Sequence, residues 1–164
     1  MVIDRRQLLL GGTAITALAA FAWLRPIGAS VAAEGDFPFK LSDAEWKAKL
    51  DPAAYDVLRH EGTERPYSSP LNDEKRAGTY LCAGCEQPLF ASETKYDSRT
   101  GWPSFYTFIE GALGTSIDNT MFMERVEVHC SNCGGHQGHV FEDGPQPTGL
   151  RYCINGVALT FQAA

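Results

Sequence analysis

Basic residues are few in this chain of 164 residues, which has 14 lysines and arginines against 20 aspartates and glutamates. The formal net charge is −6, and no long run of one sign interrupts the sequence. This balance argues against nucleic-acid binding as the main function, because phosphate contacts need clustered lysine and arginine. The chain also lacks internal repeats and low-complexity segments, so we expect a single soluble domain.

Cysteine is scarce too, and the five residues present are an odd number that cannot all pair in disulfides. Disorder is excluded by a hydrophobic content of 44%, which is enough to form a core. Sixteen glycines and nine prolines indicate many turns, and this favours a β-rich fold.

The one long apolar run lies at the N-terminus, where Arg5 and Arg6 precede an apolar stretch that continues to Leu24. Small residues follow at 29–33, and the order basic, apolar, small is typical of a cleaved export signal. The paired arginines resemble a twin-arginine signal, which exports folded proteins. We therefore expect a signal over residues 1–33 and a periplasmic protein in a bacterium. The run is short for a permanent anchor, but an uncleaved membrane anchor is the alternative.

Two short helices are expected after a linker at residues 34–40. Ser42 and Glu45 form a capping-box pattern that predicts the start of the first helix. Pro52 is suited to the first position of the second helix. The following residues, 62–78, are polar and rich in turn formers, which indicates a loop.

The β signal begins at Gly78 and continues to the end of the chain. Alternation predicts a strand near residues 122–129, with one face formed by Phe122, Val126 and Val128. Alternation from Arg151 to Phe161 predicts a further strand. The folded domain at residues 41–164 is thus expected to be mainly β, with an antiparallel core and a short helical cap at its N-terminus.

Two C-x-x-C pairs, separated by 44 residues, predict a metal site formed by Cys82, Cys85, Cys130 and Cys133. Each pair can form a knuckle with two thiolates, and two knuckles complete the tetrahedral shell that zinc prefers. Four thiolates leave no open position, so one structural zinc per chain is expected. Two disulfides and a redox-active C-x-x-C are the alternatives.

The fifth cysteine, Cys153, is the candidate nucleophile. On a strand, Arg151, Cys153 and Asn155 would share one face, whereas Tyr152 and Ile154 would be buried on the other. A neighbouring cation favours the thiolate, which is the nucleophilic form. An inert buried cysteine is the alternative, and the polar neighbours argue against it.

Two histidines in a glycine-rich segment, His136 and His139, are candidates for proton transfer at neutral pH. They follow the second knuckle directly, so a bound metal would fix the segment that carries them. The alternative is a structural role near the metal or in the core. Trp102, in a Gly-Trp-Pro turn, could line a pocket for a sulfur-bearing group, but taken alone this pattern favours an ordinary core tryptophan.

These motifs together resemble the B-type methionine-R-sulfoxide reductases. The resemblance extends from about Leu41 to Phe161 and is carried by the two C-x-x-C pairs and by four segments, which are Thr94–Asp97, Gly101–Phe105, Gly135–Phe141 and Arg151–Asn155. It implies two antiparallel sheets packed as a sandwich or open barrel, with zinc opposite the active site. It also implies reduction of the R epimer of methionine sulfoxide, mainly in proteins, which is a repair reaction under oxidative stress.

The resemblance also assigns roles to individual residues. It implies that Cys153 is the nucleophile and becomes a sulfenic acid, with His136, His139 and Asn155 in the active site. Arg151 would lie near the thiolate, and Asp143 would be an acidic partner of the histidines. Trp102 would hold the methyl group of the substrate.

One position departs from the family pattern, because Thr100 stands where many relatives carry a recycling cysteine. All five cysteines already have a role, so we expect a one-cysteine enzyme, regenerated by a small thiol or a thioredoxin-like protein. A monomer that does not bind nucleic acid is expected. The rival function is a non-enzymatic, exported zinc-binding interaction module, which would leave Cys153 and the histidines unexplained.

Overall fold

The computed structural model describes residues 35–120 and 123–164. The expected export signal and Phe122 therefore lie outside the described residues. Within the part of the chain that is described, no helix is both long enough and apolar enough to cross a membrane.

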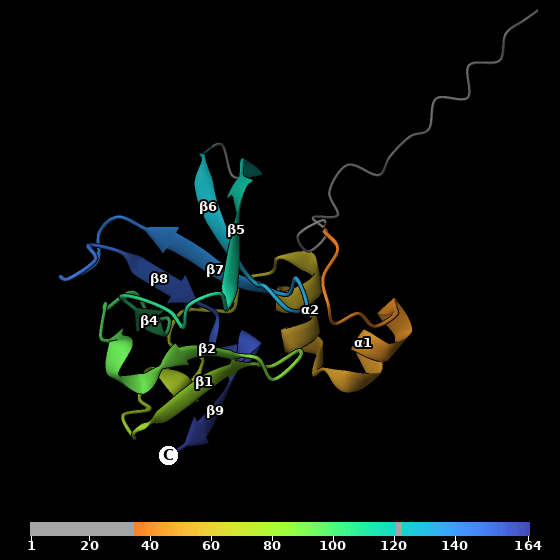
Figure 1. The fold of residues 1–164 in the computed structure, drawn as a ribbon, viewed down its shortest axis with the longest axis horizontal. Coiled ribbons are helices and arrows are strands. Elements are labelled where there is room, and N and C mark those ends of the chain that lie inside the picture. Colours follow the sequence, from red (N-terminus) through yellow and green to blue (C-terminus); the bar gives the residue numbers. More distant parts are fainter. Residues whose placement is uncertain (1–34, 121–122) are drawn as a thin grey trace, which may run out of the picture.

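Two helices begin where the sequence predicts. Helix α1 (Asp43–Lys49) has Ser42 as its N-cap, and Ser42 and Glu45 form the expected capping box. Helix α2 (Pro52–His60) begins with its proline and buries Ala54, Val57 and Leu58. This buried face packs α2 against the strand β7 (His136–Phe141) and the short helix η4 (Gly156–Ala158), as Figure 1 shows.

The β core consists of two antiparallel sheets and forms no closed barrel. The smaller sheet has the order β2-β1-β9, with β1 (Gly78–Cys82), β2 (Pro88–Ala91) and β9 (Leu159–Ala163). The larger sheet has the order β3-β4-β8-β7-β6-β5. Its other strands are β3 (Lys95–Tyr96), β4 (Ser104–Phe105), β5 (Leu113–Asp118), β6 (Arg125–Cys130) and β8 (Arg151–Ile154). The loop at residues 62–78 contains the short helix η1 (Pro70–Asn72), and η2 (Ser92–Thr94) joins β2 to β3.

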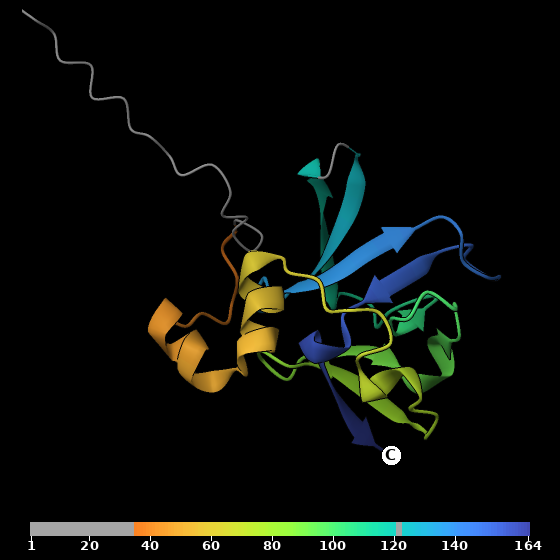
Figure 2. The same cartoon turned by 180° about the vertical axis from the view of Figure 1, so that it is seen from behind.

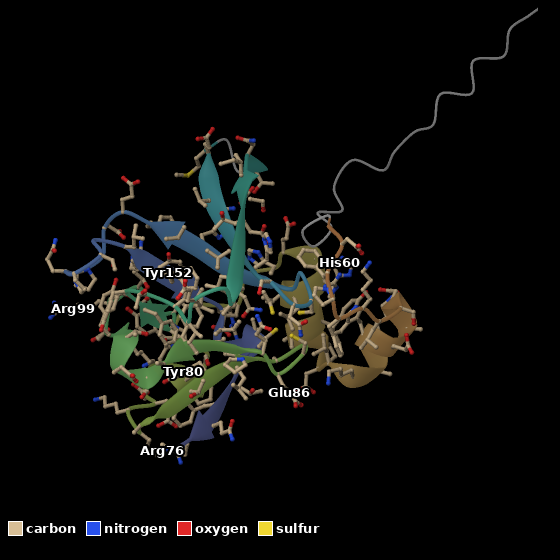
Figure 3. The ribbon with its side chains drawn as sticks, in the orientation of Figure 1. His60, Arg76, Tyr80, Glu86, Arg99 and Tyr152 are labelled. Atoms are coloured by element: carbon tan, nitrogen blue, oxygen red, sulfur yellow. The ribbon has the colours of Figure 1, made fainter. Side chains whose placement is uncertain are left out.

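Aromatic rings connect the two sheets in the core. Phe90 and Phe105 stack with their ring centroids 4.2 Å apart, and Tyr80 meets Phe105 edge to face at 5.0 Å. Figure 3 shows Tyr80 and Tyr152 inside the molecule and Arg76 at its margin. The rings of Tyr80 and Phe90 belong to β1 and β2 and that of Phe105 to β4, so these contacts fix the two sheets relative to each other.

The predicted strand from Arg151 to Phe161 is in fact two strands that belong to different sheets. Strand β8 ends at Ile154, η4 turns the chain, and β9 joins the smaller sheet (Figure 2). The turn is tight at Gly156, where an added Cβ would lie 2.0 Å from the Ser69 hydroxyl. The alternating pattern therefore predicted both strands but not the turn between them.

The described part of the segment expected to be a linker, residues 35–40, packs against the second knuckle. The amide of Phe39 donates to the carbonyl of Asn132 at 2.8 Å, and the ring of Phe37 meets His129 at 5.7 Å. Through these contacts, Phe37 and Phe39 cover part of the second knuckle.

Candidate functional site

A row of polar residues crosses the larger sheet from strand to strand. Ser104 is paired with Cys153, Cys153 with His139, His139 with Glu127, and Glu127 with Ser116. Directly paired residues of an antiparallel sheet point to the same face. The register of five strands therefore places the thiol between a serine hydroxyl and an imidazole.

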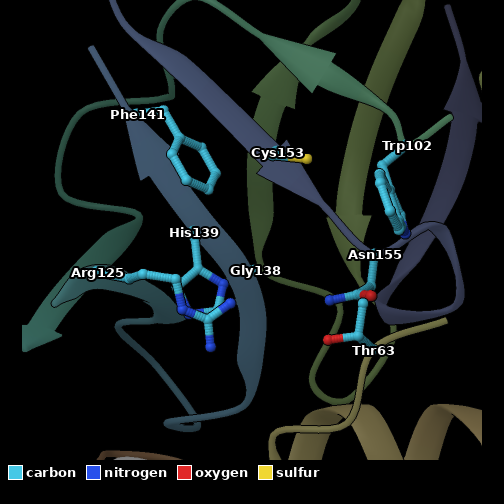
Figure 4. Close-up of a pocket in the computed structure, with 8 residues that line it drawn as sticks. All are labelled: Thr63, Trp102, Arg125, Gly138, His139, Phe141, Cys153 and Asn155. Atoms are coloured by element: carbon cyan, nitrogen blue, oxygen red, sulfur yellow. The ribbon is translucent and has the colours of Figure 1, made fainter. Parts of the chain in front are cut away.

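A pocket of about 130 Å³ opens over this row, and Figure 4 shows its lining. In that view the Cys153 sulfur lies between the rings of Phe141 and Trp102. Of the residues predicted for the site, four line the pocket, together with four others; the eight are Thr63, Trp102, Arg125, Gly138, His139, Phe141, Cys153 and Asn155. A thiol, an imidazole, an amide and two aromatic rings thus face one small space.

Gly138 lets the strands approach closely at the pocket. Its φ is +155°, and an added Cβ would lie 2.0 Å from the carbonyl oxygen of Cys153. A glycine is therefore required beside the candidate nucleophile.

Burial raises the pKa of the Cys153 thiol above its ordinary value. The Arg151 charge and a contact with the Thr100 hydroxyl oppose this shift without reversing it. The prediction that the cation favours the thiolate gave the right direction for Arg151 but omitted the larger effect of burial. Burial thus favours the thiol form of Cys153 in the substrate-free protein.

Asp143 is not the partner of the histidines that the resemblance implied. Its carboxylate accepts two hydrogen bonds from Arg151, each 2.8 Å long, from Nε and Nη2. The guanidinium of Arg151 also lies over the ring of Phe141, with 4.4 Å from Cζ to the ring centroid. Asp143 lies two residues past the end of β7, in the loop that leads to β8, and it orients Arg151 instead.

The carboxylate partner of His139 is Asp118, at the end of β5. Nε2 of His139 lies 2.8 Å from Oδ2 of Asp118, and the same oxygen accepts a 2.6 Å bond from Nη2 of Arg125. Burial would raise the pKa of Asp118, but bonds from Thr120 and His139 and the charge of Arg125 hold it below its usual range. Burial lowers the pKa of His139, although Asp118 opposes that shift. His139 is therefore a neutral imidazole beside an ionised carboxylate.

The carboxylate partner of His136 is Glu127 on β6. Nδ1 of His136 lies 2.8 Å from Oε1 of Glu127, and the other oxygen of Glu127, Oε2, has Ser116 and His129 as hydrogen-bond partners. Burial would raise the pKa of Glu127, but these hydrogen bonds hold it well below its usual range. His136 is 1% exposed and does not line the pocket; its Nε2 has no partner among the described residues.

Glu64 connects two other pocket residues through its backbone. Its carbonyl accepts a 3.1 Å bond from the indole of Trp102, and its amide donates to Oδ1 of Asn155 at 3.0 Å. The Glu64 carboxylate accepts bonds from the amides of Gly156 and Val157 in η4. Burial raises the pKa of this carboxyl, and the two backbone bonds oppose the rise. The loop after α2 thereby fixes both Trp102 and Asn155.

The four knuckle cysteines meet in one cluster, with ligand atoms all within 4.8 Å of one another. Sγ of Cys82 lies 3.7 Å from that of Cys133, and Sγ of Cys85 lies 3.5 Å from that of Cys130. All five cysteines are free, so the alternative of two disulfides is not observed. Sulfurs around a tetrahedral zinc, at about 2.3 Å from the metal, are about 3.8 Å apart. The cluster therefore fits a metal ion of this kind.

The electrostatics of the cluster also fit a cation. Hydrogen bonds among the thiols, led by those with Cys130, lower the pKa of Cys85 and raise that of Cys133. Thiols packed this closely interact strongly, and a bound cation would favour the thiolate form of all four. Cys82 ends β1 and Cys130 ends β6, so a bound ion would join the two sheets.

Besides the four pocket-lining residues that were not predicted, the sequence analysis missed three carboxylates that hold site residues, which are Asp118, Glu127 and Glu64. Arg125, Glu127 and His129 alternate with the apolar residues of β6, and such a polar face ordinarily faces solvent. Here Glu127 is 3% and His129 8% exposed, so the polar face is covered. The one available signal was the pattern of Glu127 and His129 on the same face of a predicted strand, which could have revealed Glu127.

Comparison with known proteins gives a consistent result. A family model described as the SelR domain matches residues 50–163. Three proteins named peptide methionine sulfoxide reductase MsrB are similar. The one from Methanosarcina mazei is 56% identical over 73% of this chain and 86% of its own length. The one from Agrobacterium fabrum is 51% identical over 74% and 90%, and that from Pseudomonas putida is 57% identical over 72% and 90%.

Proposed function

This chain belongs to the MsrB family of peptide methionine sulfoxide reductases, and from that premise we propose how its pocket reduces the R epimer of methionine sulfoxide. The observation that carries the proposal is the register that places the Cys153 thiol beside His139 in a pocket lined by Trp102. A binding module would need no such thiol, and the family similarity does not favour that alternative.

The reaction begins when the sulfur of Cys153 attacks the sulfoxide sulfur. Neutral His139 is the acceptor of the thiol proton. Asp118 keeps the imidazole proton on Nε2 of His139, which leaves Nδ1 to accept. Protonated His139 then gives a proton to the sulfoxide oxygen as that oxygen moves to Cys153. The products are methionine and a Cys153 sulfenic acid, so one oxygen atom moves and two electrons leave the cysteine.

The aromatic residues determine how the substrate lies. Thioether and methyl groups pack favourably on aromatic rings, and Trp102 and Phe141 face the pocket from opposite sides of the thiol. Asn155 is held by Glu64 and by the carbonyl of Gln137 at 3.1 Å, so its position is fixed before substrate binds. This preorganised arrangement suits a single methionine side chain.

Two external thiols restore the enzyme. The first condenses with the sulfenic acid, forming a mixed disulfide and water, and the second reduces that disulfide to the Cys153 thiol. A small thiol or a thioredoxin-like protein is the proposed donor, because Thr100 occupies the position two before Trp102.

The proposed occupant of the cysteine cluster is one structural zinc ion held by Cys82, Cys85, Cys130 and Cys133. Four sulfurs fill its shell, so the ion supplies folding free energy and takes no part in the oxygen transfer.

The proposed site of action is the periplasm, reached through a twin-arginine signal at residues 1–33. This route suits a protein that folds around a metal before export. Replacement of Arg5 and Arg6 by lysine should retain the protein in the cytoplasm, as measured by cell fractionation. Normal export of that variant would indicate the general secretory route.

The test of the activity uses separated R and S epimers of methionine sulfoxide with dithiothreitol. We expect turnover of the R epimer alone. Equal turnover of both epimers, or of neither, would contradict the proposed specificity or the proposed activity.

A further inference from the structure

Three hydroxyl groups connect the Cys153 sulfur to a backbone carbonyl. Oγ1 of Thr100 lies 4.0 Å from Sγ of Cys153 and 2.8 Å from Oγ of Ser98. Oγ of Ser98 lies 2.7 Å from Oγ of Ser104, which donates to the carbonyl of Trp102 at 3.1 Å. Ser104 is fully buried and the other two are partly buried, so water competes little for these bonds.

The donor and acceptor roles of the three hydroxyl groups follow from the one proton that each of them carries. A carbonyl only accepts, so the single proton of Ser104 is used on Trp102. Ser104 must then accept from Ser98, and Ser98 must accept from Thr100. The proton of Thr100 is thereby committed to Ser98, and the remaining interaction of Thr100 with Cys153 is as an acceptor for the S–H group.

In the proposed reaction, Cys153 needs a hydrogen-bond donor in place of an acceptor. A thiolate or an ionised sulfenic acid carries lone pairs and no proton, so it needs a donor. Thr100 can supply one only if Ser98 and Ser104 also turn their protons towards it, which gives up the bond to the Trp102 carbonyl. A bond to a neutral carbonyl is exchanged for a stronger one to a charged acceptor.

We propose that Thr100, Ser98 and Ser104 form a hydrogen-bond switch that accepts from the Cys153 thiol at rest and donates to its ionised and oxidised forms. The inference rests on the proposed function, because it concerns the intermediate of that reaction. Without a cysteine at position 100, the sulfenic acid persists until an external thiol arrives. Thr100 then stabilises the intermediate that a recycling cysteine would otherwise consume.

The test compares two variants that the switch affects in opposite directions. Thr100→Val removes the donor and should raise the pH midpoint of Cys153 alkylation. Ser98→Ala removes the acceptor of the Thr100 proton. Thr100 can then donate to the thiolate without any change in the hydrogen bonds of Ser104. Ser98→Ala should therefore lower the midpoint. Loss of packing at this site would not produce opposite shifts, and Thr160→Val, at an exposed threonine of β9, serves as the matched control.

The second measurement follows the intermediate. After oxidation by one equivalent of methionine R-sulfoxide without reductant, the sulfenic acid is trapped with dimedone at successive times and quantified by mass spectrometry. Thr100→Val should shorten its lifetime about tenfold, whereas Thr100→Ser should preserve it. Shifts of the same sign in Thr100→Val and Ser98→Ala, or an unchanged lifetime in Thr100→Val, would overturn the switch. Failure of the wild type to release methionine would instead contradict the proposed function, since alkylation needs no substrate.

Discussion

Nε2 of His139 lies 2.8 Å from the carboxylate of Asp118, at the end of the strand furthest from Cys153 in the larger sheet. The carboxylate is ionised and only accepts, so the proton of neutral His139 resides on Nε2. Nδ1 is then the nitrogen available for proton transfer. A residue outside every recognised motif therefore determines which ring nitrogen takes part in the reaction.

Replacement of Asp118 by asparagine should slow methionine sulfoxide reduction in single turnover by about 10- to 100-fold at pH 7, because acid–base catalysis contributes about 10²–10⁴-fold in total. Asp118 raises the pKa of His139, so its loss lowers that pKa further. In the proposed reaction neutral His139 first takes the thiol proton, and a lower pKa makes it a weaker acceptor, so the rate falls. Asp51→Asn, at a helix cap that makes no side-chain bond, is the control. An unchanged single-turnover rate in Asp118→Asn would assign the proton transfer to another group.

Replacement of Cys153 by serine should abolish reduction while preserving the fold and metal content. A hydroxyl is a far weaker nucleophile than a thiolate at neutral pH. Thiol titration of the metal-loaded protein should find one reactive group in the wild type and none in this variant. Measurable turnover by Cys153→Ser would place the nucleophile elsewhere.

Replacement of Cys130 by serine should cause loss of metal and of folding together. Structural zinc contributes about 10–16 kcal/mol in small zinc domains, and here it would also join the two sheets. Metal analysis and circular dichroism of the purified variant measure both properties. A folded, active and metal-free Cys130→Ser protein would show that the cluster is dispensable.

Replacement of Glu64 by alanine should lower both stability and kcat/KM. The amides of Gly156 and Val157 lose their acceptor, which costs about 2–4 kcal/mol for two part-buried donors. The carboxylate also holds the Glu64 backbone, which bonds Trp102 and Asn155, against η4, so catalysis suffers as well. Glu64→Gln retains one acceptor oxygen and should lie between the wild type and alanine in urea denaturation. Equal stability of all three proteins would refute this role.

Replacement of Thr100 by cysteine should create an internal route for regeneration. The Thr100 hydroxyl already lies 4.0 Å from the Cys153 sulfur, so a thiol there can reach the sulfenic acid. After stoichiometric oxidation, mass spectrometry should find a 100–153 disulfide in the variant. The wild type should contain no internal disulfide and four reduced cluster cysteines. A wild-type disulfide between Cys153 and a knuckle cysteine, formed at the turnover rate, would contradict the one-cysteine mechanism.

Local patterns allowed the sequence to predict both helix starts, the cysteine cluster and the alternation around Cys153. Each of these depends on residues that are close in the chain or on ligand chemistry that is independent of distance. Tyr152 and Ile154 are buried and Cys153 is half-buried, as the strand pattern predicts.

The partners of the histidines could not be predicted, because they depend on strand register. Glu127 bonds His136 although it is paired with His139, since a bulge between Val128 and His129 shifts the register of β6 and β7. Asp143 is near His139 in sequence, yet it bonds Arg151 on the adjacent strand. An irregularity of one residue thus decides which carboxylate meets which imidazole, and no local pattern encodes it.

Strand β8 is hydrogen-bonded on both sides, by β4 and β7, so the backbone of Cys153 cannot move outward. An oxidised side chain must therefore travel to the thiol, and the damaged protein must release enough of its own chain to deliver it. Oxidised methionines on mobile surface segments are then repaired at once. Oxidised methionines in the core of a stable protein become accessible only when that protein unfolds locally. Their repair rate therefore reports the rate of local unfolding of the substrate protein rather than the catalytic rate of the enzyme.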